Sequence, residues 1–570
     1  MSALIHTRQK TGGIRREHYK AGINKHWNME TIVINNYDEY SFIFKGYLIL
    51  ISFLFLLVVI LGNKFLRSTS ISLKKKFITI GIIVLAFLII SGFLFLEKIP
   101  FLVDGDASRI ALESLVIWKN KGSIFTTGWG SYQGMIFFLQ GSFLKIFNQK
   151  ILGLRSFSVI GGIVTVLSTY LLGSEILGIE VGFFASLCLS VMPIFWFFFR
   201  TGTDFILVPS FLPLILYLIF LSLRKNVFFL ILAGIILGFS QYFYHPVRLV
   251  PLVVLPSFIY LARRNWPFKK ILIGVFFLII FSFITYLPML KYFSKKPKTL
   301  SARFDEVSIF KPGWLENEIK NTSIRKVVKR QVLNPFLVFL KETDATKMHY
   351  YFGHYLPFVG SCLLVVGIFK LIKEKRPELL VLLFWLIGGI ILGGVLVIDS
   401  PQDSRYLILL PVVSIFIGEG VNFVLSLFKK KNKSLVIKLI FFLYGANCFW
   451  EIYNLELVQT PKYGGNTLIA TYAGRYLHKN LYNRSVYFLG NDYLYYNAVP
   501  TLPFLAGVPG EDVDQPLIES IKELPQRQAL FIILPSRYND LETLKQLYPN
   551  GITKQFQNFY GKTLFWIYEL

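Results

Sequence analysis

The feature that most constrains the fold is a series of long apolar runs separated by short, basic loops. Twelve runs lie at about 46–63, 77–96, 156–177, 181–199, 205–223, 227–243, 247–262, 271–289, 355–371, 378–398, 405–428 and 435–451. A helix of about 20 apolar residues crosses the hydrocarbon core of a bilayer. The pattern therefore predicts an all-α polytopic membrane protein with about 12–13 transmembrane helices within 46–451.

Charge and composition support a membrane protein over a soluble or nucleic-acid-binding one. Only 16% of the 570 residues are charged, and the net charge is +27, whereas soluble domains carry about 25% charged residues. The basic residues gather in alternate loops: Asn63–Lys76, Arg224–Asn226, Arg263–Lys270, Lys370–Arg376 and Lys429–Lys433. The positive-inside rule then predicts a multi-pass protein of the plasma or inner membrane, with lipid and not nucleic acid as the partner of its positive charge.

This orientation places the remaining segments. We expect 1–45 to be a disordered basic tail, 98–154 and 291–354 to be long outer loops, and 452–570 to be a small extracytoplasmic α/β domain with strands near 485–489, 529–534 and 563–568. The short run 134–147 contains Gln140 and Lys145, so it should lie in the interface or re-enter. A basic tail on the outside conflicts with the charge rule, unless the first run does not span or translation starts at Met29.

The stretch FLVDGDASRIALE, residues 101–113, places acids directly after an apolar span. If Asp106 begins a helix, then Asp106, Arg109 and Glu113 fall near one face, with Asp104 just before them. The alternative is that an acid here only caps a helix, as Asp often does.

Further ionisable groups gather at the predicted outer ends of spans, namely Arg155, Arg200, Asp204, His245, Arg248 and Arg405. Each one alone could mark the interface by snorkelling. Together on one leaflet they predict an electropositive, acid-containing pocket suited to a lipid phosphate. His349 and His354 flank YYFG and favour an aromatic interface over a metal site, and no Walker A, dinucleotide or HExxH motif occurs.

The order of several motifs resembles that of a known group. VDGDASRIALESL, TGWGSYQGMIFFLQGSFLKIFN, LGLRSFSVIGGIVTVLSTYLLG, FRTGTDFILVP, YFYHPVRLVPL and SRYLILLP follow one another over roughly 77–430. In this they resemble the bacterial GT-C membrane glycosyltransferases, with the protein O-mannosyltransferase and lipid A aminoarabinose transferase relatives (glycosyltransferase family 39-like). The resemblance implies a polyprenyl-phosphate-linked sugar donor, an extracytoplasmic acceptor and an external active site on the first outer loop.

Site residues are carried over position by position from this resemblance. Asp106 matches the acid of the first loop, although Ala107 replaces the Glu that usually follows. The resemblance therefore does not decide which of Asp104 and Asp106 has which role. Arg109, Arg155 and Asp204 also fit. Tyr132 and Gln133 stand near the place of a lysine that some relatives carry.

The expected reaction is inverting sugar transfer with Asp106, or Asp104, as the base and Asp204 as a third catalytic acid. The expected substrate-binding residues are Arg109, Glu113, Tyr132, Arg155, Arg200, His245, Arg248 and Arg405, with the guanidinium groups on the lipid phosphate. The scheme needs no metal, although a divalent cation could bind between Asp106, Asp204 and Glu113.

Two other functions use the same features. A transporter or flippase of a lipid-linked sugar would need the same phosphate pocket, but the sequence shows no inverted repeat. A non-catalytic cell-envelope assembly subunit would explain Ala107 as a lost catalytic residue. The sugar and the acceptor, whether protein, lipid or glycan, stay open.

Overall fold

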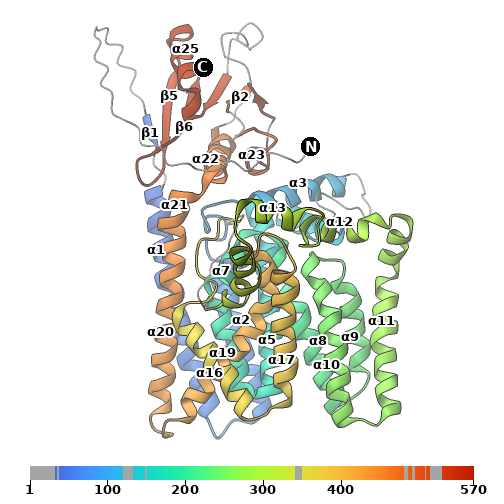
Figure 1. The fold of residues 1–570 in the computed structure, drawn as a ribbon. Helices are drawn as coiled ribbons and strands as arrows, with labels where there is room; N and C mark the ends of the chain where they lie inside the picture. Colours follow the sequence, from blue (N-terminus) through green and yellow to red (C-terminus); the bar gives the residue numbers. More distant parts are fainter. Residues whose placement is uncertain are drawn as a thin grey trace.

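The computed structural model describes residues 32–34, 37–119, 133–147, 150–340, 349–480, 485–490, 494–507, 509–513 and 529–570. In Figure 1 a bundle of long helices carries a small sheet domain at one end.

The bundle confirms the predicted all-α membrane fold, because every one of the twelve apolar runs contains a helix. Nine described helices are long and apolar enough to cross a membrane, or ten if the pair α6 (Ile179–Val191) and α7 (Pro193–Thr201), bent by 64°, is one span. The nine are α1 (Tyr37–Arg67), α2 (Leu73–Phe93), α5 (Lys150–Leu177), η2 with α8 (Asp204–Ser210, Phe211–Arg224), η3 with α10 (His245–Arg248, Leu249–Asn265), α11 (Phe268–Lys295), α17 with η5 (Pro377–Ile390, Ile391–Val395), α18 and η6 with α19 (Asp403–Tyr406, Leu407–Leu409, Leu410–Ser426), and α20 with η7 and α21 (Lys433–Asn454, Leu455–Gln459, Thr460–Tyr463).

Two predicted spans form shorter helices, which accounts for the lower count. These are α9 (Phe229–Ser240) and α16 (Phe358–Lys373).

Small residues let helices of the bundle approach closely. A Cβ added to Gly367 of α16 would lie 1.9 Å from the carbonyl oxygen of Phe416 in α19, and one added to Gly420 of α19 would lie 2.1 Å from that of Leu363.

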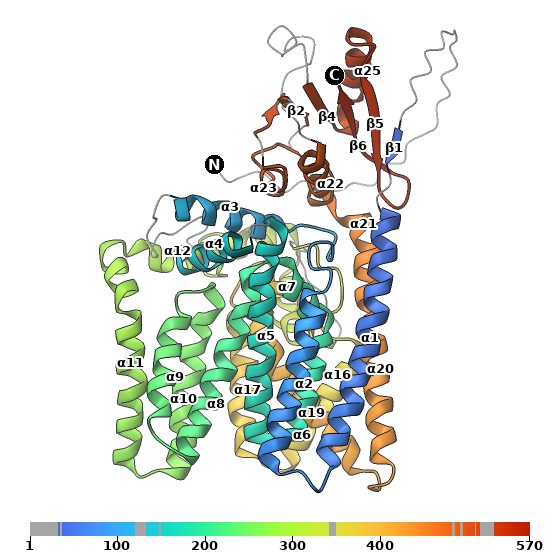
Figure 2. The same cartoon turned by 180° about the vertical axis from the view of Figure 1, so that it is seen from behind.

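Helices also lie across one end of the bundle. The segment predicted to be interfacial forms α4 (Met135–Phe147), which lies beside α3 (Gly105–Lys119) over the end of the bundle (Figure 2). The second long loop adds α12 (Lys298–Val307), α13 (Trp314–Asn321), and a helix that runs through α14 (Ile324–Val328), η4 (Lys329–Leu333) and α15 (Asn334–Leu337). The labelled helices α3, α4, α12 and α13 lie over the same end of the bundle as the sheet domain (Figure 2).

The C-terminal region is a mixed sheet with helices, and the predicted strands appear as β2 (Ser485–Leu489), β4 (Ala529–Ile533) and β6 (Thr563–Glu569). With β1 (Ile32–Ile34), β3 (Glu511–Asp512) and β5 (Ile552–Gln557), the described strands follow the order β1-β5-β6-β4-β2-β3. The pairs β1–β5, β4–β2 and β2–β3 are parallel, and β5–β6 and β6–β4 are antiparallel. Helices α22 (Gly465–Asn480), α23 (Thr501–Ala506) and α25 (Tyr538–Leu547) belong to the same region.

The structure differs from the expected tail at its end. Residues 32–34 pair with β5 through the register Ile32–Lys554 to Ile34–Phe556, and α1 begins at Tyr37, nine residues before the predicted span. A short apolar strand gains backbone hydrogen bonds at the edge of the sheet, which composition alone does not reveal. This pairing puts the start of α1 on the same side of the bundle as the C-terminal domain (Figure 1).

Candidate active site

Three carboxylates from two distant parts of the chain surround one imidazole. His349 Nδ1 lies 3.7 Å from an oxygen of Asp104 and 3.9 Å from one of Asp106, and its Nε2 lies 3.8 Å from Asp403. The imidazole is buried, and it packs edge-on against the rings of Phe198 and Phe205 at 5.7 and 5.1 Å. The cluster thus joins the first long loop, the second long loop and the start of α18.

Asp104 is the residue that caps α3. Its Oδ1 accepts a hydrogen bond from the Ala107 N–H at 2.9 Å, and its carbonyl accepts from the Ser108 hydroxyl at 2.7 Å. An Asp at this position satisfies N–H groups that the first turn leaves open. The capping interpretation therefore holds for Asp104, and its second oxygen is turned toward His349.

Asp106 is the most accessible acid of the cluster. Its side chain is 32% exposed, against 7% for Asp104 and 0% for Asp403. Burial of much of the carboxyl group and the neighbouring Asp104 raise its pKa, while His349, Arg109 and Arg303 oppose that rise. A carboxylate that can be reached and has a raised pKa suits a base that takes a proton from a bound hydroxyl.

His349 carries a positive charge in this setting. Burial alone would lower the pKa of the imidazole, but Asp403, Asp104 and Asp106 together raise it to about 10. The imidazolium offsets part of the acidic charge and keeps the carboxylates near one another.

Asp204 lies beside this cluster at the first turn of η2. The chain turns into η2 through Gly202, whose φ of 91° suits glycine, and the Gly202 N–H donates to the Ser158 hydroxyl at 3.1 Å. Asp204 is buried within electrostatic range of Asp106 and His349. Neither of its carboxylate oxygens accepts a hydrogen bond from another residue in the described ranges. A buried carboxylate in this state is a ready acceptor for a substrate hydroxyl.

Cations and a phenol complete the surroundings. Arg303 of α12 is within electrostatic range of Asp106, and both Arg303 and Arg405 are within range of Tyr244. The Tyr244 hydroxyl pairs with that of Ser404 at 3.2 Å, and its ring packs 4.5 Å from Phe205. The Arg405 guanidinium donates to the Ile398 carbonyl at 2.7 Å. Arg109 is likewise within electrostatic range of Asp106. The substrate-binding roles expected of Arg109 and Arg405 stay predictions.

Arg155 and Arg200 donate hydrogen bonds to backbone carbonyls. Both side chains are fully buried and point into the turn that follows α2. Arg155 donates to the carbonyls of Leu96, Glu97 and Leu102 at 2.6–3.3 Å. Arg200 donates to those of Ser91, Gly92, Leu94 and Ile99. Because the last carbonyls of a helix need donors, this geometry supports a role in holding the turn. The substrate-binding role expected of these two residues stays a prediction.

The other predicted residues lie around this end of the bundle. Glu113 is in α3, two turns beyond Asp106. His245 and Arg248 begin the span of α10, where both are half-buried. Tyr132 lies outside the described residues.

The loop that leads into Asp104 is fastened by the C-terminal region. The Val103 N–H donates to the Thr471 hydroxyl at 3.2 Å, and the Thr501 hydroxyl donates to the Val103 carbonyl at 3.0 Å. Arg475 donates to the Phe101 carbonyl at 3.0 Å and lies 4.8 Å from the Phe101 ring. The sheet domain thus contributes to the position of the acids.

Buried Glu456 of η7 holds the same loop from the bundle side. Its carboxylate accepts hydrogen bonds from the Tyr40 hydroxyl and, at 3.2 Å, from the Phe101 N–H. The loop is therefore tied to α1 as well.

Sequence reasoning missed four of these residues: His349, Asp403, Arg303 and Glu456. Asp403 stands two residues before Arg405, just ahead of the motif SRYLILLP, so a search for acids near span ends could have found it. The sequence favours an aromatic interface for His349, and the rings of Phe198 and Phe205 form one side of its surroundings. No three His, Cys, Asp or Glu side chains in the described ranges are arranged as a metal site.

Comparison with known proteins identifies the fold. Residues 134–288 match the family described as Dolichyl-phosphate-mannose-protein mannosyltransferase. No curated protein sequence matches the chain. The crystal structure of ArnT from Cupriavidus metallidurans in the apo state aligns with a TM-score of 0.51, at 12% identity over 86% of this chain and 97% of that one.

Two further structures are similar. ArnT from Cupriavidus metallidurans bound to undecaprenyl phosphate aligns with a TM-score of 0.50, at the same identity and coverage. AglB, an archaeal oligosaccharyltransferase from Archaeoglobus fulgidus, aligns with a TM-score of 0.49 and 12% identity over 78% of this chain and 65% of that one. The chain has the GT-C fold of membrane glycosyltransferases, as the order of its motifs implied.

Proposed function

We propose that this protein is a glycosyltransferase that moves a sugar, with inversion, from a polyprenyl-phosphate carrier to an extracytoplasmic acceptor. The observation that carries the proposal is the cluster of Asp106, Asp104, His349 and Asp403 at one end of a GT-C bundle. The match to a mannosyltransferase family over 134–288 and the likeness to ArnT, which binds undecaprenyl phosphate in one crystal structure, support the donor class.

In the proposed reaction Asp106 takes the proton of an acceptor hydroxyl. The hydroxyl oxygen attacks the anomeric carbon from the side opposite the phosphate. The bond between that carbon and the phosphate oxygen breaks, and the electron pair stays on the polyprenyl phosphate. The proton ends on Asp106, so the leaving phosphate needs positive charge but no proton.

Arg303, Arg405 and Arg109 are our candidates for that positive charge. All three lie near the acid cluster, and a planar guanidinium matches two phosphate oxygens. Asp204, whose carboxylate accepts no hydrogen bond from a described residue, would accept one from a sugar or acceptor hydroxyl. Asp104, held by the α3 cap and His349, would position Asp106 and raise its basicity.

We further propose that transfer does not depend on a bound divalent cation. His349 stands within 4 Å of three carboxylates, where its positive charge supplies what a cation would supply. In the presence of a chelator, sugar transfer should keep at least about half of its rate. A larger loss of rate that added Mn²⁺ or Mg²⁺ reverses would contradict this part of the proposal.

The test uses the full chain reconstituted in vesicles with a radiolabelled polyprenyl-phosphate sugar and membrane extract as acceptor. A transferase releases free polyprenyl phosphate and moves the label to another molecule. A flippase would change the leaflet of the labelled lipid and leave it intact, and an assembly subunit would do neither. Either of these last two results would overturn the proposal.

The location of the site is part of the proposal. The loops rich in lysine, such as Lys429–Lys433, lie at the end of the bundle opposite α3 and the sheet domain (Figure 1). By the positive-inside rule the acid cluster and residues 452–570 then face the extracytoplasmic side.

A further inference from the structure

The second long loop carries a helix whose outward side is apolar. In the continuous helix from Ile324 to Leu337, the inward positions Val327, Gln331 and Pro335 are buried. The outward positions, four residues apart, are apolar but 40–60% exposed: Ile324, Val328, Val332 and Phe336. An exposed apolar row of this kind is typical of a helix that lies in a membrane interface.

Gln331 fixes this helix at the end of a membrane span. Its side-chain amide donates to the carbonyls of Gly394, Val395 and Val397 at 2.6–3.2 Å. Val395 is the last residue of the span Pro377–Val395. The helix therefore lies at the depth where the hydrocarbon core gives way to lipid headgroups.

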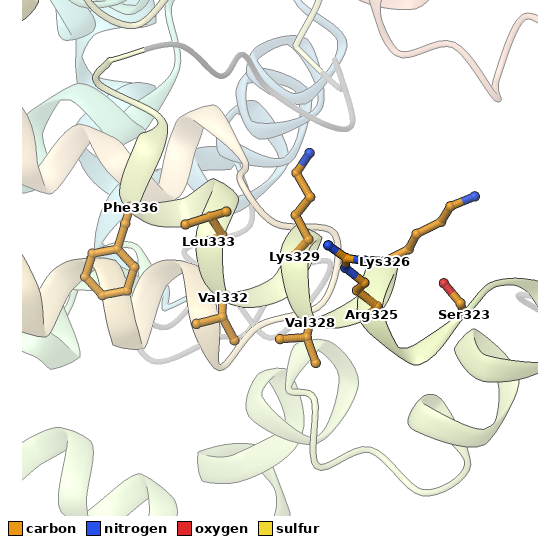
Figure 3. A pocket seen from close by; sticks show the side chains of 8 residues that line it. All are labelled: Ser323, Arg325, Lys326, Val328, Lys329, Val332, Leu333 and Phe336. Carbon is orange, nitrogen blue, oxygen red and sulfur yellow. The ribbon is translucent and has the colours of Figure 1, made fainter.

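Three cations border the apolar row. Arg325, Lys326 and Lys329 are exposed, and none of them forms a salt bridge with a residue in the described ranges. Their neighbour Arg330, in contrast, pairs with Glu318 at 2.6 Å. In Figure 3 Lys326 and Lys329 extend from one side of the helix, while Val328 and Val332 point to the other.

These side chains line an open groove of about 730 Å³, with Ser323 at one end and Leu333 and Phe336 at the other. Its two sides differ in chemistry. The cations suit a phosphate, and the apolar wall suits an acyl chain. We propose that the groove binds an anionic phospholipid of the surrounding bilayer, with the phosphate on Arg325, Lys326 and Lys329 and one acyl chain along Val328, Val332 and Phe336.

Binding at this place would hold the second outer loop on the membrane. The same loop carries Arg303, which is within electrostatic range of Asp106. The end of α12 and the residues after it are joined to the chain before Asp403 through the hydrogen bonds Ile398 N–Val307 O and Ile309 N–Leu396 O at 2.8 and 3.1 Å. A bound phospholipid thus stabilises one wall of the acid cluster without entering it.

The experiment measures lipid retention, which does not depend on sugar transfer. The purified full chain is incubated with equal amounts of phosphatidylglycerol and phosphatidylcholine, and native mass spectrometry counts the lipids that stay bound. The groove variant is Arg325→Gln/Lys326→Gln/Lys329→Gln. The matched control is Lys429→Gln/Lys430→Gln/Lys431→Gln, which removes the same charge from an exposed loop at the other end of the bundle.

We expect the wild type and the control to retain phosphatidylglycerol in preference to phosphatidylcholine. The groove variant should retain at least about ten-fold less phosphatidylglycerol, since each of the three basic residues near a headgroup contributes several-fold. Val328→Asn/Val332→Asn should weaken retention of both lipids. Equal retention of phosphatidylglycerol by the groove variant and the wild type would overturn the proposal. Displacement of the bound phosphatidylglycerol from the wild type by an equimolar amount of polyprenyl phosphate would also overturn it, because that result would assign the groove to the sugar carrier.

Discussion

At the residue scale, the charges around Asp106 act on its pKa in opposite directions. The carboxylate of Asp104 raises it, and the imidazolium of His349 lowers it. The proposed base must be deprotonated before it can accept a proton, so activity should fall on acidification through the pKa of Asp106. That acid limb should lie above the ordinary range of a carboxyl group.

Removing the charge of Asp104 should move this limb to lower pH. Asp104→Asn keeps a good helix cap, because Asn caps as well as Asp, but it removes the carboxylate that raises the pKa of Asp106. The measurement is kcat/KM for sugar transfer against pH. If the acid limb of Asp104→Asn lies at the same pH as that of the wild type, Asp104 does not act on the pKa of the base.

Removing the charge of His349 should have the opposite effect. In His349→Gln the cation that lowers the pKa of Asp106 is gone, so the acid limb should move to higher pH. A variant that only disturbs packing would reduce the rate at every pH without displacing the limb. If the acid limb moves in the same direction in Asp104→Asn and His349→Gln, the arrangement of charges around Asp106 is refuted.

At the element scale, the turn between α2 and α3 depends on buried guanidinium groups. Arg200 serves four carbonyls, at Ser91, Gly92, Leu94 and Ile99. Arg200→Met removes the donors of the Gly92, Leu94 and Ile99 carbonyls, while the Ser91 carbonyl keeps the Tyr47 hydroxyl at 2.9 Å. This loss should cost about 3 kcal/mol or more. Thermal unfolding of the purified protein should show a clear fall in Tm.

The matched control is Arg224→Met at the end of α8. Arg224 pairs with Glu175 at 2.9 Å, but its side chain is 54% exposed, so its removal should cost less than about 1 kcal/mol. An Arg200→Met protein that keeps the wild-type Tm but no longer binds the lipid-phosphate donor would return Arg200 to the substrate-binding role expected from sequence.

The elements also show what the sequence could and could not predict. The helices, Asp104, Asp106 and the order of motifs follow from local patterns, namely apolar runs, a capping acid and charges after spans. The sequence does not distinguish Arg155 and Arg200 from Arg405, because all three lie at the ends of predicted spans. Only the path of the backbone after α2 shows that Arg155 donates to three carbonyls and Arg200 to four.

His349 could not be found in this way, and Asp403 could be found as an acid near a span end but not placed beside His349. Both stand more than 240 residues from Asp104 along the chain, and His349 lies in a segment whose local sequence gives no periodic signal. The same holds for the pairing of Ile32–Ile34 with β5, which joins the two ends of the described chain. Long-range contacts of this kind depend on the packing of the whole bundle.

At the scale of the whole molecule, the sheet domain supports the loop that carries the acids. Arg475 of α22 holds Phe101 through its carbonyl and its ring. Arg475→Met should lower kcat by about ten-fold with little change in KM, because a small displacement of Asp106 affects the transition state more than donor binding. Lys479→Met, an exposed change on the same helix, is the control and should leave kcat unchanged.

Orientation in the membrane can be tested on intact cells. We expect a cysteine at Lys298 of α12 to react with a membrane-impermeant maleimide from outside, and a cysteine at Lys430 to react only after lysis. The reverse pattern would place the acid cluster in the cytosol and would rule out an extracytoplasmic acceptor.

The central claim is that the Asp106 carboxylate is the base for sugar transfer. The most direct test compares release of free polyprenyl phosphate from its sugar derivative by the wild type, by Asp106→Asn and by Asp305→Asn, an exposed carboxylate of α12 that serves as control. We predict that Asp106→Asn loses about 10²–10⁴-fold in rate with the Tm of the wild type, while Asp305→Asn keeps the full rate. Wild-type release by Asp106→Asn would contradict the account.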